Sequence, residues 1–134
     1  MALAVHLPYY ATGLRHDQLA EALEALTPEL LRVGALEVRV DRSKEDAYRF
    51  RQVIHVADKA TWAKVWNSEP FVAFRTTKIA WYQKPLAYEL YEPLTTGTAA
   101  GVSDVRGEAP ADAPVAGEAS ASPPLVGSSA GQSA

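Results

Sequence analysis

The sequence predicts an α+β fold in residues 1–94, followed by a tail that is not expected to fold. All the Trp, Tyr and Phe residues of the chain lie in residues 1–94. Within that part, hydrophobic residues recur either at alternate positions, as in strands, or at intervals of three and four, as in helices. Residues 95–134 consist mainly of Thr, Ala, Gly, Ser, Pro and Val. We therefore expect one folded domain, 1–94, and a disordered acidic tail, 95–134.

The first predicted element is a strand over residues 3–10. Leu3, Val5 and Leu7 alternate with smaller or polar residues and share one face. Pro8 disfavours pairing on both sides of the strand beyond that position, because proline lacks a backbone N–H.

A helix is predicted over residues 15–33. Its hydrophobic positions follow helical spacing: Leu19, Ala22, Leu23, Leu26 and Leu30. Pro28 either starts a fresh turn with Thr27 as N-cap or kinks the helix. Gly34 is a natural stop.

Two strands, 35–41 and 47–57, surround a charged loop and predict a hairpin. In the first, Leu36, Val38 and Val40 are expected to point inward. In the second, one face carries Tyr48, Phe50, Gln52, Ile54 and Val56, and the other carries Arg49, Arg51, Val53 and His55.

The last elements are two helical pieces and a strand. Asp58 is a candidate N-cap for a helix over 59–67, whose apolar stripe contains Trp62, Val65 and Trp66. A second helical piece follows Pro70 and carries Phe71 and Phe74. The final strand covers 86–92 and ends at Pro93.

The order β-α-β-β-α-β predicts a ferredoxin-like sandwich, with helices on one face of the sheet. Bulky residues on both faces of the first and third strands indicate that something covers the other face. We therefore expect a homodimer that forms through the sheet faces, giving a dimeric α+β barrel.

Composition and charge exclude several classes of protein. Residues 1–94 hold twelve basic and twelve acidic residues, so net charge would not drive nucleic-acid binding. No apolar run is long enough to cross a membrane, and no secretory signal is evident, so we expect a cytoplasmic protein. The chain has no Cys, and its three His lack a metal-ligand spacing, so no metal site is expected.

Residues 56–62 (VADKATW) and 67–74 (NSEPFVAF) resemble a motif of the dimeric α+β barrel superfamily, "W-E-S-K-E-A-F … S-P-x-F-x-A-F". The branch with the greatest similarity is the antibiotic biosynthesis monooxygenase type, which also ends in a "Y-E-V" strand, here YEL at 88–90. The resemblance implies a cofactor-independent oxygenase. Haem-degrading members carry an axial His at a position that falls near Thr77 here. The side chain that would bind the haem iron is therefore missing, which argues against haem degradation.

The resemblance and the residue pattern together nominate a site. His6 aligns with a pocket residue of the first strand, is expected to face the helices and is the candidate base. Candidate polar donors are Asn67, Tyr88 and Gln52. Candidate walls of an aromatic pocket are Trp62, Trp66, Tyr48, Phe50, Phe71 and Phe74. Each has a structural alternative: core packing for the aromatic residues and Gln52, a hydrogen-bonded core residue for His6, and a helix C-cap for Asn67.

Two functions follow as hypotheses. One is a small monooxygenase that needs no cofactor and acts on a quinol or an aromatic polyketide-like substrate, whose anion reacts with oxygen in a dry cavity. The other is a non-catalytic dimer that binds a hydrophobic or aromatic small molecule or has a stress-related role. A cavity containing His6 would favour the first, and a space filled by Trp62, Trp66 and Phe71 would favour the second.

Overall fold

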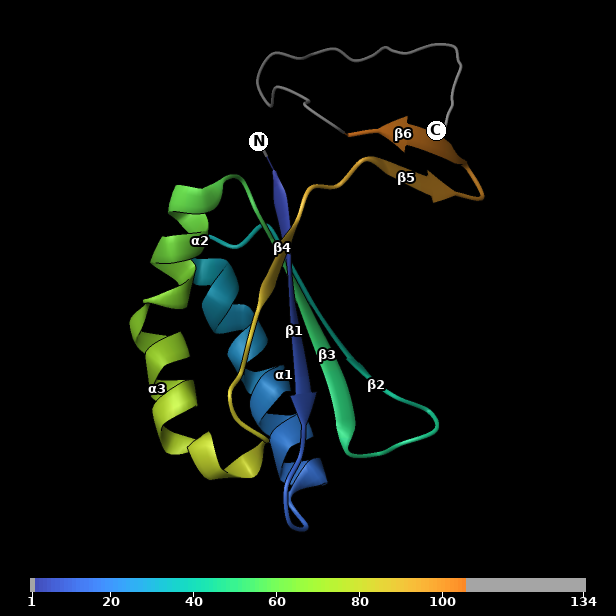
Figure 1. Cartoon of the computed structure of the whole chain (residues 1–134). Helices are drawn as coiled ribbons and strands as arrows, with labels where there is room; N and C mark the ends of the chain where they lie inside the picture. Colours follow the sequence, from blue (N-terminus) through green and yellow to red (C-terminus); the bar gives the residue numbers. More distant parts are fainter. Residues whose placement is uncertain (1, 106–134) are drawn as a thin grey trace. The chain divides into compact units, whose positions relative to one another are not determined.

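The computed structural model describes residues 2–105, which form two compact units that we describe separately. The first unit is Ala2–Pro93. Its elements are β1 (Leu3–Tyr10), α1 (His16–Arg32), β2 (Glu37–Arg42), β3 (Arg49–Val56), α2 (Lys59–Trp66), α3 (Glu69–Thr77), the 3₁₀ helix η1 (Ile79–Trp81) and β4 (Glu89–Tyr91) (Figure 1). The described part of the second unit contains a hairpin of β5 (Thr95–Thr98) and β6 (Gly101–Asp104).

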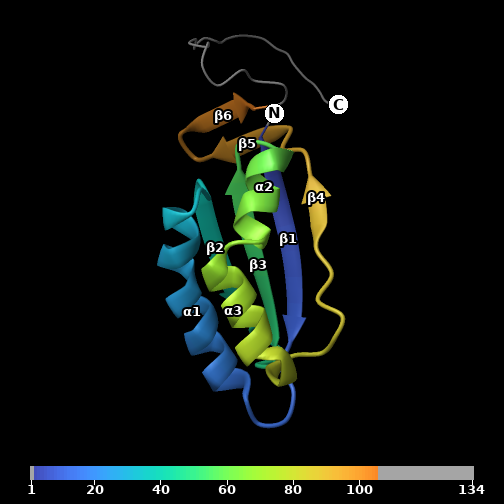
Figure 2. The same cartoon turned by 90° about the vertical axis from the view of Figure 1, so that its left-hand side faces the viewer.

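The first unit has a four-stranded antiparallel sheet in the order β2-β3-β1-β4. All three α-helices lie on the same face of this sheet (Figure 2). Val5 of β1 lies opposite Ile54 of β3 on one side and Leu90 of β4 on the other. This arrangement confirms the predicted α+β, ferredoxin-like fold.

The core lies between the sheet and the helices. β1 contributes Leu3, Val5, Leu7 and Tyr9 to the core. The residues between them are less buried, so buried and less buried positions alternate along the whole strand. The matching face of β3 contributes Phe50, Gln52, Ile54 and Val56, and α1 contributes Leu19, Leu23, Leu26 and Leu30. Among residues 2–105, Gln52 is the one polar side chain with full burial.

Local signals fix the helix ends. The Asp58 carboxylate accepts a 2.8 Å hydrogen bond from the Thr61 backbone N–H, so Asp58 caps α2 as predicted. Gly34 follows α1 with φ +131°, and a side chain at this position would contact Thr61. α1 continues through Pro28 without a break, so Pro28 does not start a separate helix.

Three predicted segments differ from the structure. The strand expected over 86–92 contains only Glu89–Tyr91, and all three residues are exposed. Leu36 precedes β2 and is 64% exposed instead of pointing inward. The tail expected to be disordered from residue 95 instead begins with the β5–β6 hairpin, whereas 106–134 lie outside the described residues.

The sheet face opposite the helices is called the open face below. As the alternation in the sequence predicted, Arg49, Arg51 and His55 of β3 share this face, and β2 presents Glu37 opposite His55 and Asp41 opposite Arg51. The bulky residues expected on this face are therefore accompanied by charged ones. Arg51 donates a 3.0 Å hydrogen bond to Asp41, so this cross-strand pair neutralises part of the charge. His55 lies 3.6 Å from Glu37.

Candidate functional site

A buried polar pair marks the helix side of the sheet. The Tyr9 hydroxyl on β1 donates a 2.8 Å hydrogen bond to Oε1 of Gln52 on β3. Both side chains lie in the core, and burial raises the pKa of Tyr9 well above its usual value. Tyr9 therefore stays protonated, and Gln52 is held with its carbonyl toward the hydroxyl.

Seven aromatic side chains form a continuous cluster between β1 and the α2–α3 layer. We call it the aromatic cluster; its members are Tyr9, Trp62, Trp66, Phe71, Phe74, Tyr82 and Tyr88. Tyr88 contacts Trp62 and Trp66 at centroid distances of 5.0 and 4.8 Å. Trp62 and Phe71 are buried, whereas Trp66 is half-buried and Tyr88 is 38% exposed. The cluster therefore reaches the surface at Trp66 and Tyr88.

Arg75 of α3 enters this cluster. Its guanidinium carbon lies 3.6 Å from the ring centroid of Trp66 and 5.1 Å from that of Phe71. Such a cation over ring faces is an attractive cation–π arrangement. Partial burial lowers the pKa of Arg75, and the guanidinium in turn partly offsets the burial that raises the pKa of Tyr9 and Tyr82.

Three hydrogen-bond donors of this region are buried without an acceptor. They are Nε2 of Gln52, Nε1 of Trp62 and Nη1 of Arg75. A buried donor without a partner costs about 1–3 kcal/mol, so three in one region form an unusual concentration. Each is a donor, and none can accept a hydrogen bond.

His6 is not part of this cluster. We expected it to face the helices, but it lies on the open face because Leu3, Val5 and Leu7 occupy the helix side of β1. There it lines a groove of about 590 Å³ together with Tyr10, Arg49, Arg51 and other residues. Its ring makes an edge contact with Tyr91 at a centroid distance of 6.2 Å, and its Nδ1 is shielded from solvent without a hydrogen-bond partner.

Two other candidate site residues, Asn67 and Phe50, also lie outside the aromatic cluster. Asn67 is exposed and caps the end of α2, with its side-chain amide donating to the Ala63 carbonyl, as the structural alternative predicted. Phe50 is buried beneath Arg42, whose guanidinium carbon lies 4.9 Å from the ring centroid.

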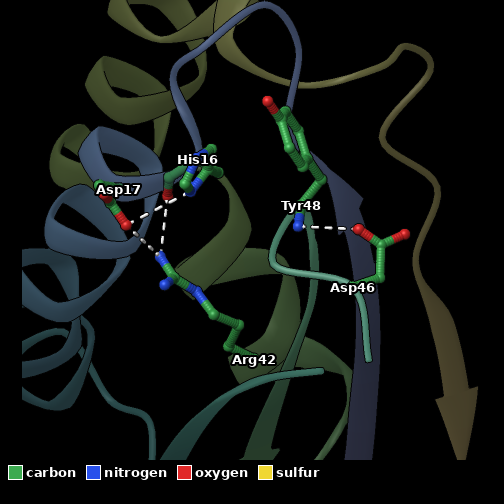
Figure 3. A network of polar contacts seen from close by, with 5 residues as sticks. All are labelled: His16, Asp17, Arg42, Asp46 and Tyr48. Atoms are coloured by element: carbon green, nitrogen blue, oxygen red, sulfur yellow. Dashed lines mark hydrogen bonds and ion pairs between the residues drawn. The ribbon is translucent and has the colours of Figure 1, made fainter. Parts of the chain in front are cut away.

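Tyr48 belongs to a polar network at the far end of the sheet. It precedes β3, and its ring lies 4.6 Å from that of His16, centroid to centroid (Figure 3). The Tyr48 ring also stacks on Tyr10. In the same network Arg42 bridges to Asp17. Tyr48 therefore packs beside the loop that joins β2 to β3 and is not part of the aromatic cluster.

The structure therefore unites six of the sequence candidates: Gln52, Tyr88, Trp62, Trp66, Phe71 and Phe74. Sequence reasoning missed Tyr9, Tyr82 and Arg75. The spacing of Tyr9 from Leu7 already placed it on the inward face, where a hydroxyl needs a partner. Arg75 lies four residues after Phe71 in the same helix, so helical periodicity placed both on one face.

Comparison with solved structures identifies this architecture. A "Putative antibiotic biosynthesis monooxygenase from Nitrosomonas europaea" superposes with a TM-score of 0.63 at 15% identity, over 67% of this chain and 88% of that one. The chain has an antibiotic biosynthesis monooxygenase-like fold. Rv0793 from Mycobacterium tuberculosis gives a TM-score of 0.63 at 14% identity, covering 70% and 96% of the two chains. PA3566 from Pseudomonas aeruginosa gives 0.62 at 20% identity, covering 67% and 91%.

These likenesses concern the fold alone. No protein-family model matches the sequence, and a search of curated proteins found no match. Within residues 2–105, no helix is long and apolar enough to cross a bilayer. No group of three or more His, Asp or Glu side chains in that range is placed to hold a metal ion.

Proposed function

We propose that this antibiotic biosynthesis monooxygenase-like domain binds a flat aromatic small molecule at the aromatic cluster and oxygenates it without a bound cofactor. The observation that carries the proposal is the cluster itself, which lies between the sheet and α2–α3 and reaches the surface at Trp66 and Tyr88. Large flat side chains with a few polar groups among them are typical of sites for aromatic ligands.

The residues limit what chemistry the site can support. Among residues 2–105, no histidine lies on the helix side of the sheet near the cluster, so the substrate has to be acidic enough to ionise when bound. Its carbanion or enolate then reacts with O₂: a CH₂ group and O₂ give a carbonyl and water, with one oxygen atom in each product. The substrate supplies the electrons, and the protein supplies a dry aromatic environment and donors for the developing oxyanion.

The test measures oxygen consumption and binding together. Anthrone and naphthoquinols are offered to the full chain, with an oxygen electrode and product analysis by mass spectrometry. We expect kcat/KM to fall about tenfold in Trp66→Leu, since one aromatic face is lost. Trp81→Leu is the matched control, because Trp81 packs against Arg15 and Lys78 outside the cluster. Equal activity of the two variants would contradict the proposed site.

A second function, binding without turnover, has two observations in its favour. Trp62, Trp66 and Phe71 pack on one another in the space where a cavity was expected, with Trp62 and Phe71 buried. The candidate base, His6, lies on the opposite face of the sheet from the cluster. Binding of these compounds with no enzyme-dependent oxygen uptake would favour this function and reject the oxygenase.

We further propose that the open face pairs with the open face of a second copy. No helix of the first unit covers this face (Figure 1), and Arg51 of this face is already paired with Asp41 within one chain. Such internal pairing leaves the face able to contact a partner without many unpaired charges.

A charge placed in this face should dissociate the dimer. Val53 lies opposite His6 in the middle of the open face. We expect Val53→Arg to shift the mass measured by light scattering from dimer to monomer, because the dimer would bury two unpaired charges. Val72→Arg on the exposed side of α3 is the control and should leave the mass unchanged. A monomeric wild-type chain would reject this interface.

A further inference from the structure

We propose that the groove at one end of the open face binds a phosphate group, either as the free anion or as the monoester of a small molecule. The groove has a volume of about 590 Å³, which is within the range of sites for small molecules. Its lining shares only Tyr9 with the aromatic cluster and does not include Val53 in the middle of the open face. The phosphate site is therefore separate from the proposed aromatic site and from the centre of the proposed dimer contact.

The groove crosses the end of the sheet, where backbone contacts join four segments in a row. The Ser43 backbone N–H donates a 2.9 Å hydrogen bond to the Arg49 carbonyl, and Arg49 lies opposite Tyr10 in the pairing of β3 with β1. At the other edge of β1, the Gln83 backbone N–H donates a 2.8 Å hydrogen bond to the Tyr10 carbonyl. All four residues line the groove. Neighbouring strands lie about 4.8 Å apart, so the row spans roughly 14 Å, which is enough for one small ligand.

Two of the four basic residues that line the groove are already paired. Arg42 donates a 3.2 Å hydrogen bond to Asp17. Arg51 donates a 3.0 Å hydrogen bond to Asp41, which within residues 2–105 is the one acidic residue of the lining. These pairs balance their own charges, so the net charge of the groove depends on the other two basic residues.

Arg49 and Lys84 carry positive charge that the chain does not balance closely. The Arg49 guanidinium lies 3.9 Å from the Asp46 carboxylate, which is too far for a hydrogen bond. Among residues 2–105, Lys84 forms no ion pair. Arg49 comes from β3 on one side of Tyr10, and Lys84 follows the segment bound to its other side. An anion in the groove would therefore be attracted from both sides of β1.

The Ser43 hydroxyl supplies a neutral donor to the same groove. Its oxygen accepts the backbone N–H groups of Glu45 and Asp46, each at 3.1 Å. These two bonds use the lone pairs of the oxygen and leave its proton without an acceptor within residues 2–105. A phosphate oxygen is a strong acceptor for such a proton.

This set of donors fits a phosphate better than a carboxylate. A phosphate monoester carries a charge of about −1.5 to −2 at neutral pH and has three acceptor oxygens. It can contact a guanidinium, an ammonium and a hydroxyl at once, whereas a carboxylate brings a single charge and two oxygens. The two unbalanced cations and the serine therefore favour the phosphate.

The test compares a phosphate ester with its neutral parent. Calorimetric titration of the full chain with ribose 5-phosphate, ribose and inorganic phosphate gives three dissociation constants. We expect ribose 5-phosphate to bind at least about tenfold more tightly than ribose, because ribose lacks the charged acceptor. Tighter binding of the ester than of inorganic phosphate would assign the site to a monoester, and equal affinity would assign it to the free anion.

Three variants locate the binding. Arg49→Gln and Lys84→Gln should each weaken ribose 5-phosphate about five- to tenfold, since each removes one of the two unbalanced cations. Lys64→Gln is the matched control, because it removes one positive charge from an exposed position of α2 outside the groove. It should change the affinity by less than about twofold, since exposed charges at a distance are screened by salt. Circular dichroism checks that each variant is folded.

The outcomes that overturn the proposal are specific to this groove. If wild type binds neither ribose 5-phosphate nor inorganic phosphate, the phosphate site is rejected, and the proposed aromatic site is unaffected by that result. If Lys64→Gln weakens binding as much as Arg49→Gln does, the attraction comes from the overall charge, and the groove is rejected as the site. Unchanged affinity in both Arg49→Gln and Lys84→Gln would also reject it.

Discussion

Phe71→Ala should lower the free energy of unfolding by about 3–5 kcal/mol, the range for removing a large buried ring. Phe71 is fully buried and contacts Trp62 and Trp66 of α2 and Phe74 of its own helix, so its loss removes the ring contacts that join α3 to α2. Chemical denaturation followed by tryptophan fluorescence measures the change. The result matters for function because Phe71 also lies under Arg75, at 5.1 Å from its ring centroid to the guanidinium carbon.

Val72→Ala provides the matched control for this substitution. Val72 is the next residue of α3 and is 40% exposed, so its truncation should change stability by no more than about 0.5 kcal/mol. If Phe71→Ala cost as little as the control, the rings would not be packed as described. The aromatic cluster would then be unable to hold a ligand in a defined position.

Tyr9→Phe should destabilise the domain by about 1–3 kcal/mol, because it leaves the Gln52 carboxamide buried with neither oxygen nor nitrogen paired. The double variant Tyr9→Phe/Gln52→Leu should recover most of that loss, since both polar partners are then replaced by apolar groups. Thermal and denaturant unfolding of the two single variants and the double variant give the coupling energy.

The sign of the coupling decides the interpretation. If the two single changes simply add, the Tyr9 hydroxyl and Gln52 do not interact in the folded protein. If the double variant is less stable than Tyr9→Phe alone, Gln52 contributes through packing and not through its hydrogen bond. In the first case, the Tyr9 hydroxyl would not fix the orientation of Gln52 in the core.

Periodicity predicted the elements and most of the aromatic cluster correctly. Trp62 and Trp66 lie one helical turn apart, and Phe71 and Phe74 are separated by nearly one turn, so their common direction follows from helix geometry. The same reasoning placed Gln52 on the inward face of its strand. Its hydrogen bond to Tyr9 was beyond sequence reasoning, because it joins residues 43 positions apart.

The errors have physical causes. Strand alternation by itself places His6 on the face opposite to Val5 and Leu7, and the alignment to a family position wrongly overrode that pattern. Arg75 was missed because a long charged side chain in a helix usually points to solvent, and only the neighbouring ring faces hold it inward. The hairpin after residue 94 was missed because its β-branched threonines are surrounded by small residues that indicate disorder.

The shortness of β4 has a consequence for how the protein avoids aggregation. β4 pairs with β1 only from Ala4 to His6, so the outer edge of β1 beyond His6 is left without a strand partner until Gln83 donates to the Tyr10 carbonyl. Tyr10 and Pro8 point their backbone groups to the same edge, since alternate residues of a strand share a direction. Proline presents no N–H there, so a foreign strand finds one fewer donor to pair with along this gap.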